Sequence, residues 1–138
     1  MKNIALTLLF LFSITTFSQD KKVYSSKSVD KLPTLITCKG NYFDAKECTS
    51  KSVQSHVYQK TNPNMIFKMK GKRKSEKVFI EYVVTEKGDV EKIKVKVRNK
   101  KLKKKLFERM KNLPKFKPGS INNKPVSVKM ELNLTISI

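Results

Sequence analysis

The stretch at residues 126–138 alternates between apolar and polar side chains without a break. A period of two puts the apolar set on one face of an extended strand and the polar set on the other. So long and regular a half-buried strand requires a sheet whose inner face is covered by other elements. The apolar positions are Val126, Val128, Met130, Leu132, Leu134, Ile136 and Ile138.

Two further strands are indicated upstream. Residues 78–84 are largely apolar on both faces, as a central strand should be, whereas residues 90–98 alternate apolar residues with lysines. The segment between them contains Gly88 where a positive φ is needed, so the two strands are predicted to form a hairpin. Lysines along the second strand are a common protection of a sheet edge against pairing with other chains.

A helix is predicted between the second and third strands. Leu102, Leu106, Met110 and Leu113 recur at helical spacing and share one face, and Pro114 ends the pattern. This helix returns the chain to the end where the second strand began. The third strand therefore lies antiparallel beside the first, by a crossover of the usual hand.

These connections predict the fold class. We expect an α+β fold with a three-stranded antiparallel sheet, in the order 2-1-3, and two helices packed on one face. The other helix is expected to be capped by Asp44 and to reach about Gln59, with Val53 and Val57 on its apolar face. Residues 126–138 then form a sheet edge that carries fewer lysines than the opposite edge.

The two cysteines, Cys38 and Cys48, enclose a short loop. In an exported protein an even pair this close predicts a disulfide. The alternative is two unpaired buried thiols. A metal site is disfavoured because His56 is the only histidine and four ligands are usual.

The N-terminus indicates export. Lys2 precedes a short apolar run, and small polar residues follow it near Ser18, so residues 1–18 are interpreted as a signal peptide. The alternative is a short uncleaved membrane anchor. Residues 19–37 are interpreted as a linker and 38–138 as one domain with a disulfide loop and helix at its start. The expected location is the periplasm or the exterior, or the inner membrane if the segment is not cleaved.

The order strand, turn, strand, helix, Pro/Gly loop and strand resembles the C-terminal domain of TonB-type energy transducers. The resemblance is carried by residues 83–90, the Leu102/Leu106 helix, residues 116–119 (Phe-Lys-Pro-Gly) and residues 123–126 (Asn-Lys-Pro-Val). It implies a domain that is not an enzyme and that is associated with transmembrane transport. It also implies that Phe116 packs a loop onto the sheet.

In this family the last strand binds a short peptide of an outer-membrane receptor by strand addition. The resemblance therefore predicts a peptide-binding edge at Val126, Ser127, Val128, Lys129, Met130, Glu131, Leu132, Asn133 and Leu134. One alternative is an anchored energy transducer that lacks the long proline-rich spacer, since only Pro33 lies between the apolar segment and Cys38.

A second alternative comes from the charge. Lys and Arg number 31 against 11 Asp and Glu, which gives a net charge of +20, so anionic surfaces are expected partners. The basic stretches at residues 68–77 and 92–105 lack interleaved aromatic residues, so specific nucleic-acid recognition is not expected. The sequence contains no paired-carboxylate or nucleophile pattern. No enzymatic activity, cofactor, metal or small-molecule substrate is predicted.

Overall fold

The computed structural model describes residues 21–58 and 75–137. The predicted signal peptide at 1–18 and most of the lysine-rich stretch at 68–77 lie outside these residues. Two helices and seven strands are described: β1 (Val23–Ser25), β2 (Thr34–Leu35), α1 (Tyr42–Tyr58), β3 (Ser75–Val84), β4 (Val90–Lys96), α3 (Lys100–Lys111), β5 (Phe116–Lys117), β6 (Gly119–Ile121) and β7 (Lys124–Ser137).

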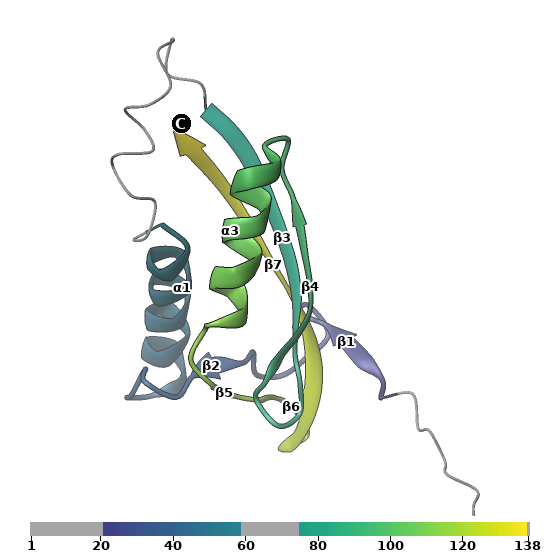
Figure 1. Cartoon of the computed structure of the whole chain (residues 1–138). Helices are drawn as coiled ribbons and strands as arrows, with labels where there is room; N and C mark the ends of the chain where they lie inside the picture. The colour runs from purple at the N-terminus through teal and green to yellow at the C-terminus, as the bar shows by residue number, and fades with distance from the viewer. Residues whose placement is uncertain (1–20, 59–74, 138) are drawn as a thin grey trace, which may run out of the picture.

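The strands form a mixed five-stranded sheet in the order β1-β7-β3-β4, with β6 also paired to β7, and a separate two-stranded sheet of β2 and β5. The prediction of a three-stranded antiparallel sheet was therefore wrong in strand number and in direction. The predicted arrangement of the three long strands was right, because β4, β3 and β7 lie side by side in the predicted order and pair antiparallel. Figure 1 shows these three long strands behind α3.

The extra strands come from segments without clear periodicity. β1 lies within residues 19–37, which the sequence indicated as a linker, and it pairs with β7 in parallel. β5 and β6 come from the Pro/Gly segment that follows α3, and β5 pairs with β2. Two or three residues are too few to show a period of two, so only a long-range partner defines them as strands.

The hairpin between β3 and β4 forms as predicted. Gly88 has φ of +84°, and its N–H donates a hydrogen bond to the Thr85 carbonyl at 2.9 Å. On β3 the side chains of Val78, Ile80 and Val84 are buried and form the centre of the core. The core therefore lies on this face of β3, which the sequence did not distinguish because both faces of the strand are largely apolar.

Helix α3 covers this face of the sheet (Figure 1). Leu106 and Met110 are fully buried, and truncating such a side chain to alanine costs about 2–5 kcal/mol. Asn99 caps the helix, since its side-chain oxygen accepts a hydrogen bond from the Leu102 N–H at 3.1 Å. Capping and the apolar stripe together keep α3 helical despite its many lysines.

Helix α1 packs beside α3. Its cap is Asn41 rather than the predicted Asp44, because the Asn41 side-chain oxygen accepts the Asp44 N–H at 3.1 Å. At the other end the Arg109 guanidinium donates to the Val57 carbonyl, and His56 Nε2 lies 3.1 Å from the Arg109 carbonyl. The buried Arg109 thus bonds a main-chain carbonyl in the last described turn of α1, and it joins the two helices.

Candidate functional site

The candidate site is the edge of β7 that faces away from β3. From residue 128 to residue 137 β7 pairs with β3 in an unbroken antiparallel register. Along it Val128, Leu134 and Ile136 are buried, whereas Glu131 and Asn133 are exposed on the opposite face. One main-chain edge of β7 is thus used by the sheet, and the other is the edge on which the sequence placed peptide recognition.

Part of this edge is already occupied by the chain itself. Val23, Tyr24 and Ser25 of β1 pair in parallel with residues 127–129 of β7. Before this part of β7, Val126 pairs with Gly119 of β6 in a separate ladder. The first four residues of the predicted peptide-binding edge, 126–129, therefore have strand partners within the chain.

A turn leads the chain away from β7 immediately after β1. The Ser25 carbonyl accepts two hydrogen bonds from Ser28, one from its N–H at 3.0 Å and one from its hydroxyl at 2.9 Å. The Ser25 hydroxyl accepts a third, from the Lys27 N–H at 3.4 Å. This is a local serine turn of the kind that competes with strand pairing. Among the described residues no strand covers β7 beyond Lys129 on this side.

Tyr58, the last described residue of α1, marks the other end of the open edge. Its hydroxyl donates to the Thr135 carbonyl at 3.0 Å. This bond comes from α1 rather than from β3, which indicates that the main-chain groups of Thr135 point outward. Successive residues of a strand direct their main-chain groups to opposite edges. Because the register is unbroken, Glu131 and Asn133 also direct their N–H and C=O groups outward.

The open window is therefore five residues long, from Met130 to Leu134. At about 3.3 Å per residue it spans about 16 Å. Met130 and Leu132 are only partly buried, although they pack against the core. An added strand would meet these two apolar side chains on one face and the polar Glu131 and Asn133 on the other.

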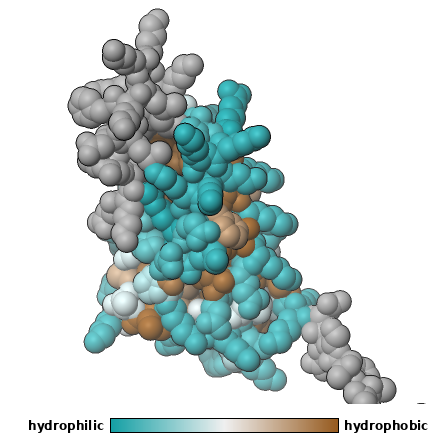
Figure 2. Space-filling model, viewed as in Figure 1, coloured by the Kyte–Doolittle hydropathy of each residue, from teal (hydrophilic) through white to brown (hydrophobic). Residues whose placement is uncertain are grey.

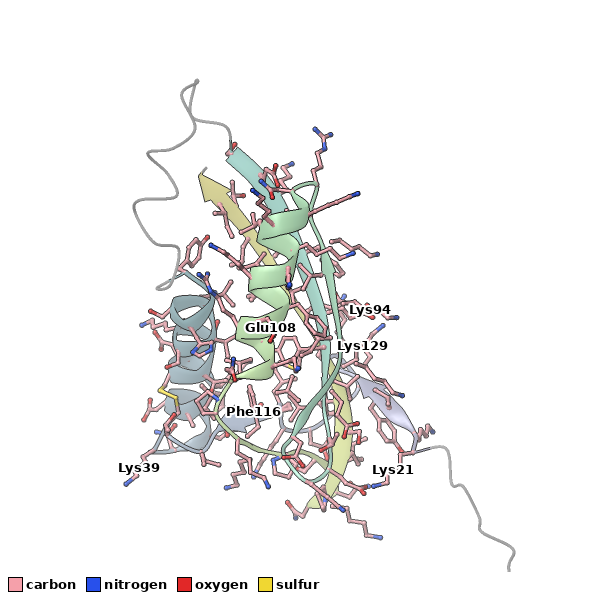
Figure 3. The ribbon with its side chains drawn as sticks, in the orientation of Figure 1. Lys21, Lys39, Lys94, Glu108, Phe116 and Lys129 are labelled. Atoms are coloured by element: carbon pink, nitrogen blue, oxygen red, sulfur yellow. A yellow bond between two sulfur atoms is a disulfide. The ribbon has the colours of Figure 1, made fainter. Side chains whose placement is uncertain are left out.

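Charges on the open face of the sheet flank this window. Lys129 of β7 and Lys94 of β4 both approach Glu81 of β3, at 3.8 and 3.6 Å; Figure 3 labels the two lysines. The three side chains link the strands that flank β3 across the outer face. Since the Lys94 and Lys129 side chains are 69% and 43% exposed, these ion pairs contribute little to stability, but they place charged groups beside the window.

The remaining predicted residues support the fold around the site. Cys38 and Cys48 form the predicted disulfide. It links the loop after β2 to α1, and the Thr49 hydroxyl of α1 also accepts the Leu35 N–H of β2 at 2.8 Å. Phe116 is 2% exposed, so it packs its loop into the core as expected.

Sequence reasoning missed β1 and Tyr58, which limit the open window at its two ends. The signal for β1 was weak, since Val23 and Tyr24 are adjacent residues of high strand propensity, but Val29 and Ile36 of the same segment have it as well. Tyr58 gave no signal, because its role depends on where the end of α1 lies relative to β7.

Comparison of the chain with protein-family models, with curated proteins and with solved structures gives no match of significance. The resemblance to the TonB C-terminal domain therefore stays a prediction. Across residues 21–58 and 75–137, no group of three or more His, Cys, Asp and Glu side chains is placed to hold a metal ion. In the same part of the chain no helix is long and apolar enough to cross a membrane.

Proposed function

We propose that this chain is an exported, non-enzymatic binding module, similar to the TonB C-terminal domain. It binds an extended peptide of an outer-membrane receptor at the open edge of β7 between Met130 and Leu134. The peptide adds a strand to the sheet through main-chain hydrogen bonds. The association with transport across the outer membrane rests on the order of elements in the sequence.

One observation carries the proposal: the chain already adds an extended segment to this same edge. β1 pairs in parallel with residues 127–129 and then turns away at Ser25. A peptide placed on residues 130–134 would continue the line of β1 along β7. Its backbone would meet the outward groups of Glu131 and Asn133 in place of water.

The window also sets the chemistry of the peptide. Main-chain bonds supply affinity in strand addition, and alternate side chains supply specificity. Residues of the peptide on the core side would lie against the half-buried Met130 and Leu132. Residues on the other side would face Glu131 and Asn133. We therefore infer a peptide of about five residues with alternating apolar and polar side chains.

Amide hydrogen exchange tests the geometry without a ligand. The N–H groups of Glu131 and Asn133 should exchange quickly, whereas those of Met130, Leu132 and Leu134 should be protected by β3. On addition of labelled peptides from the periplasmic segments of outer-membrane receptors, the first two should become protected. Fast exchange at Met130 and Leu132 instead would show that the outward and inward residues are assigned the wrong way round.

Proline substitution tests the binding itself. Glu131→Pro removes one outward donor and leaves the ladder with β3 intact, so the fold should persist while peptide binding falls at least tenfold, the effect of about 1.4 kcal/mol. Glu131→Ala is the matched control, because it removes the same side chain and keeps the N–H. If a folded Glu131→Pro variant binds every tested peptide as tightly as Glu131→Ala does, the recognition edge lies elsewhere.

A further inference from the structure

The outer face of α3 is the most basic surface of any described element. Six of its twelve residues are exposed lysines, and its one acidic residue is Glu108. Figure 3 shows Glu108 on the outer side of the helix. The exposed lysines are Lys100, Lys101, Lys103, Lys104, Lys105 and Lys111.

This arrangement breaks two local rules of helix stability. Lys100 is one turn from Lys103 and Lys104, and like charges at these spacings repel. The same lysines occupy the first turns of the helix, where the helix dipole favours acidic side chains, yet the first turn of α3 has none. A sequence that breaks local rules without a gain in the fold commonly does so for function.

In the described part of the chain, several lysines outside α3 form ion pairs with acidic side chains, whereas most lysines of α3 do not. Lys51 pairs with Glu47 at 2.6 Å, and Lys115 with Asp89 at 3.6 Å. Within the described residues Lys100, Lys101, Lys103 and Lys104 have no such acidic partner. At this end of the helix the Glu76 carboxylate accepts the Asn99 N–H at 3.3 Å, and among the residues that the structure describes no ion pair joins it to any of these four lysines. The positive field of this face is therefore little neutralised by the chain itself.

An exposed aromatic ring lies in the middle of the basic face. Phe107 follows Lys103 and Lys104 by four and three residues, so it lies on the same side of the helix. Its side chain is 37% exposed, and the Lys111 ammonium lies 5.9 Å from its ring centroid. Figure 2, which views the α3 side, shows a mainly hydrophilic surface with small apolar patches.

We propose that the outer face of α3 binds the surface of an anionic lipid bilayer. Clustered lysines are attracted to anionic headgroups, and an aromatic ring among them can enter the boundary between headgroups and acyl chains. The helix lies on the outside of the molecule, across the sheet (Figure 1), so it presents an outward row of cations rather than a groove. Such a row fits a flat charged surface better than it fits a strand of nucleic acid.

Vesicle co-sedimentation of the full chain tests the proposal. Vesicles containing phosphatidylglycerol should bind the protein, and vesicles of phosphatidylcholine alone should bind it much less. Each lysine near the surface is expected to strengthen binding about fivefold, so removing four should weaken it at least about a hundredfold. The variant replaces four lysines of the outer row by glutamine: Lys100, Lys103, Lys104 and Lys111.

A matched control removes the same charge from elsewhere. Its four glutamines replace exposed lysines outside α3 that also lack a described ion pair: Lys39, Lys46, Lys117 and Lys124. Circular dichroism should show both variants folded, and the control should weaken vesicle binding far less than the α3 variant does. Equal weakening by both variants would mean that net charge alone drives binding, and it would overturn the proposal.

Phe107 separates a bilayer from a soluble polyanion. The chain has no tryptophan, so Phe107→Trp places a single reporter in the basic face. Its emission should shift to the blue with phosphatidylglycerol vesicles and stay unchanged with heparin. Vesicle binding without a blue shift, or an equal shift with heparin, would contradict insertion of this face and would assign the lysines to polyanions in general.

Discussion

Gly88→Ala should destabilise the fold by about 3–5 kcal/mol. Gly88 has φ of +84°, and a Cβ added there would lie 1.9 Å from the carbonyl oxygen of Phe116. The same two residues are joined by a hydrogen bond, from the Phe116 N–H to the Gly88 carbonyl at 2.9 Å. The turn between β3 and β4 therefore holds the loop that carries Phe116 at a distance that only glycine allows.

Three contributions make up the expected loss. A left-handed backbone costs a residue with a Cβ about 1–2 kcal/mol. Relieving the overlap moves the Phe116 backbone, which breaks the hydrogen bond at about 1 kcal/mol. The same movement loosens the packing of the Phe116 ring, which is 2% exposed; complete loss of a buried phenylalanine costs about 3–5 kcal/mol, and we expect a fraction of this.

Two variants separate these contributions in urea unfolding followed by circular dichroism. Gly40 has φ of +107°, but a Cβ added there would lie 3.4 Å from Asp44, an ordinary contact. Gly40→Ala should therefore cost only the backbone term, about 1–2 kcal/mol. Gly88→Asn should stay almost as unstable as Gly88→Ala, because asparagine tolerates the left-handed backbone but keeps the Cβ. If Gly88→Ala costs no more than Gly40→Ala, the close approach to Phe116 has no energetic role.

Three further predictions concern other parts of the core. Arg109→Met leaves the Val57 carbonyl without its donor and should cost about 2–3 kcal/mol in urea unfolding; a loss below about 0.5 kcal/mol would refute this role. Burial raises the pKa of Tyr82 from 10.0 to about 12. Between these pH values the folded chain binds more protons than the unfolded chain. The contribution of Tyr82 to the free energy of unfolding is therefore fully present below pH 10, and about 3 kcal/mol is lost as the pH rises through 12. Tyr82→Phe should abolish this fall, and an unchanged pH profile would exclude Tyr82 as its source. Reducing the bond between Cys38 and Cys48 should cost about 3 kcal/mol; two alkylatable thiols in the unreduced protein would contradict it.

The central elements could be predicted because their patterns are local. β4, β7 and α3 each carry enough residues to show a period, β3 is marked by a continuous apolar run, and Gly88 marks the hairpin. β3 nevertheless begins at Ser75, within a lysine-rich stretch that gave no strand signal. Those first residues are held by pairing with β7, as between Glu76 and Ile136, so their conformation depends on a partner rather than on their own pattern.

The candidate edge was predictable in position but not in extent. The alternation of residues 126–138 and the crossover placed β7 beside β3. Three residues, Val23–Ser25, are too short to be recognised as a strand, yet they cover the start of that edge. The cap of α1 was misassigned for a related reason. Asn41 and Asp44 are both good capping residues, and only the path of the backbone from the disulfide loop selects Asn41.

The pairing of β7 bears on when the chain can fold during synthesis. β7 pairs with β1, β3 and β6, and it emerges from the ribosome after all three. Val23 and Ser127 pair although about one hundred residues separate them, and contacts this distant in sequence form slowly. A nascent chain that has not yet released β7 has β3 paired only with β4, and a lone hairpin is marginal in water. If residues 1–18 direct export, this topology delays folding until β7 has been released, which leaves the earlier segments unfolded while a translocation channel engages them.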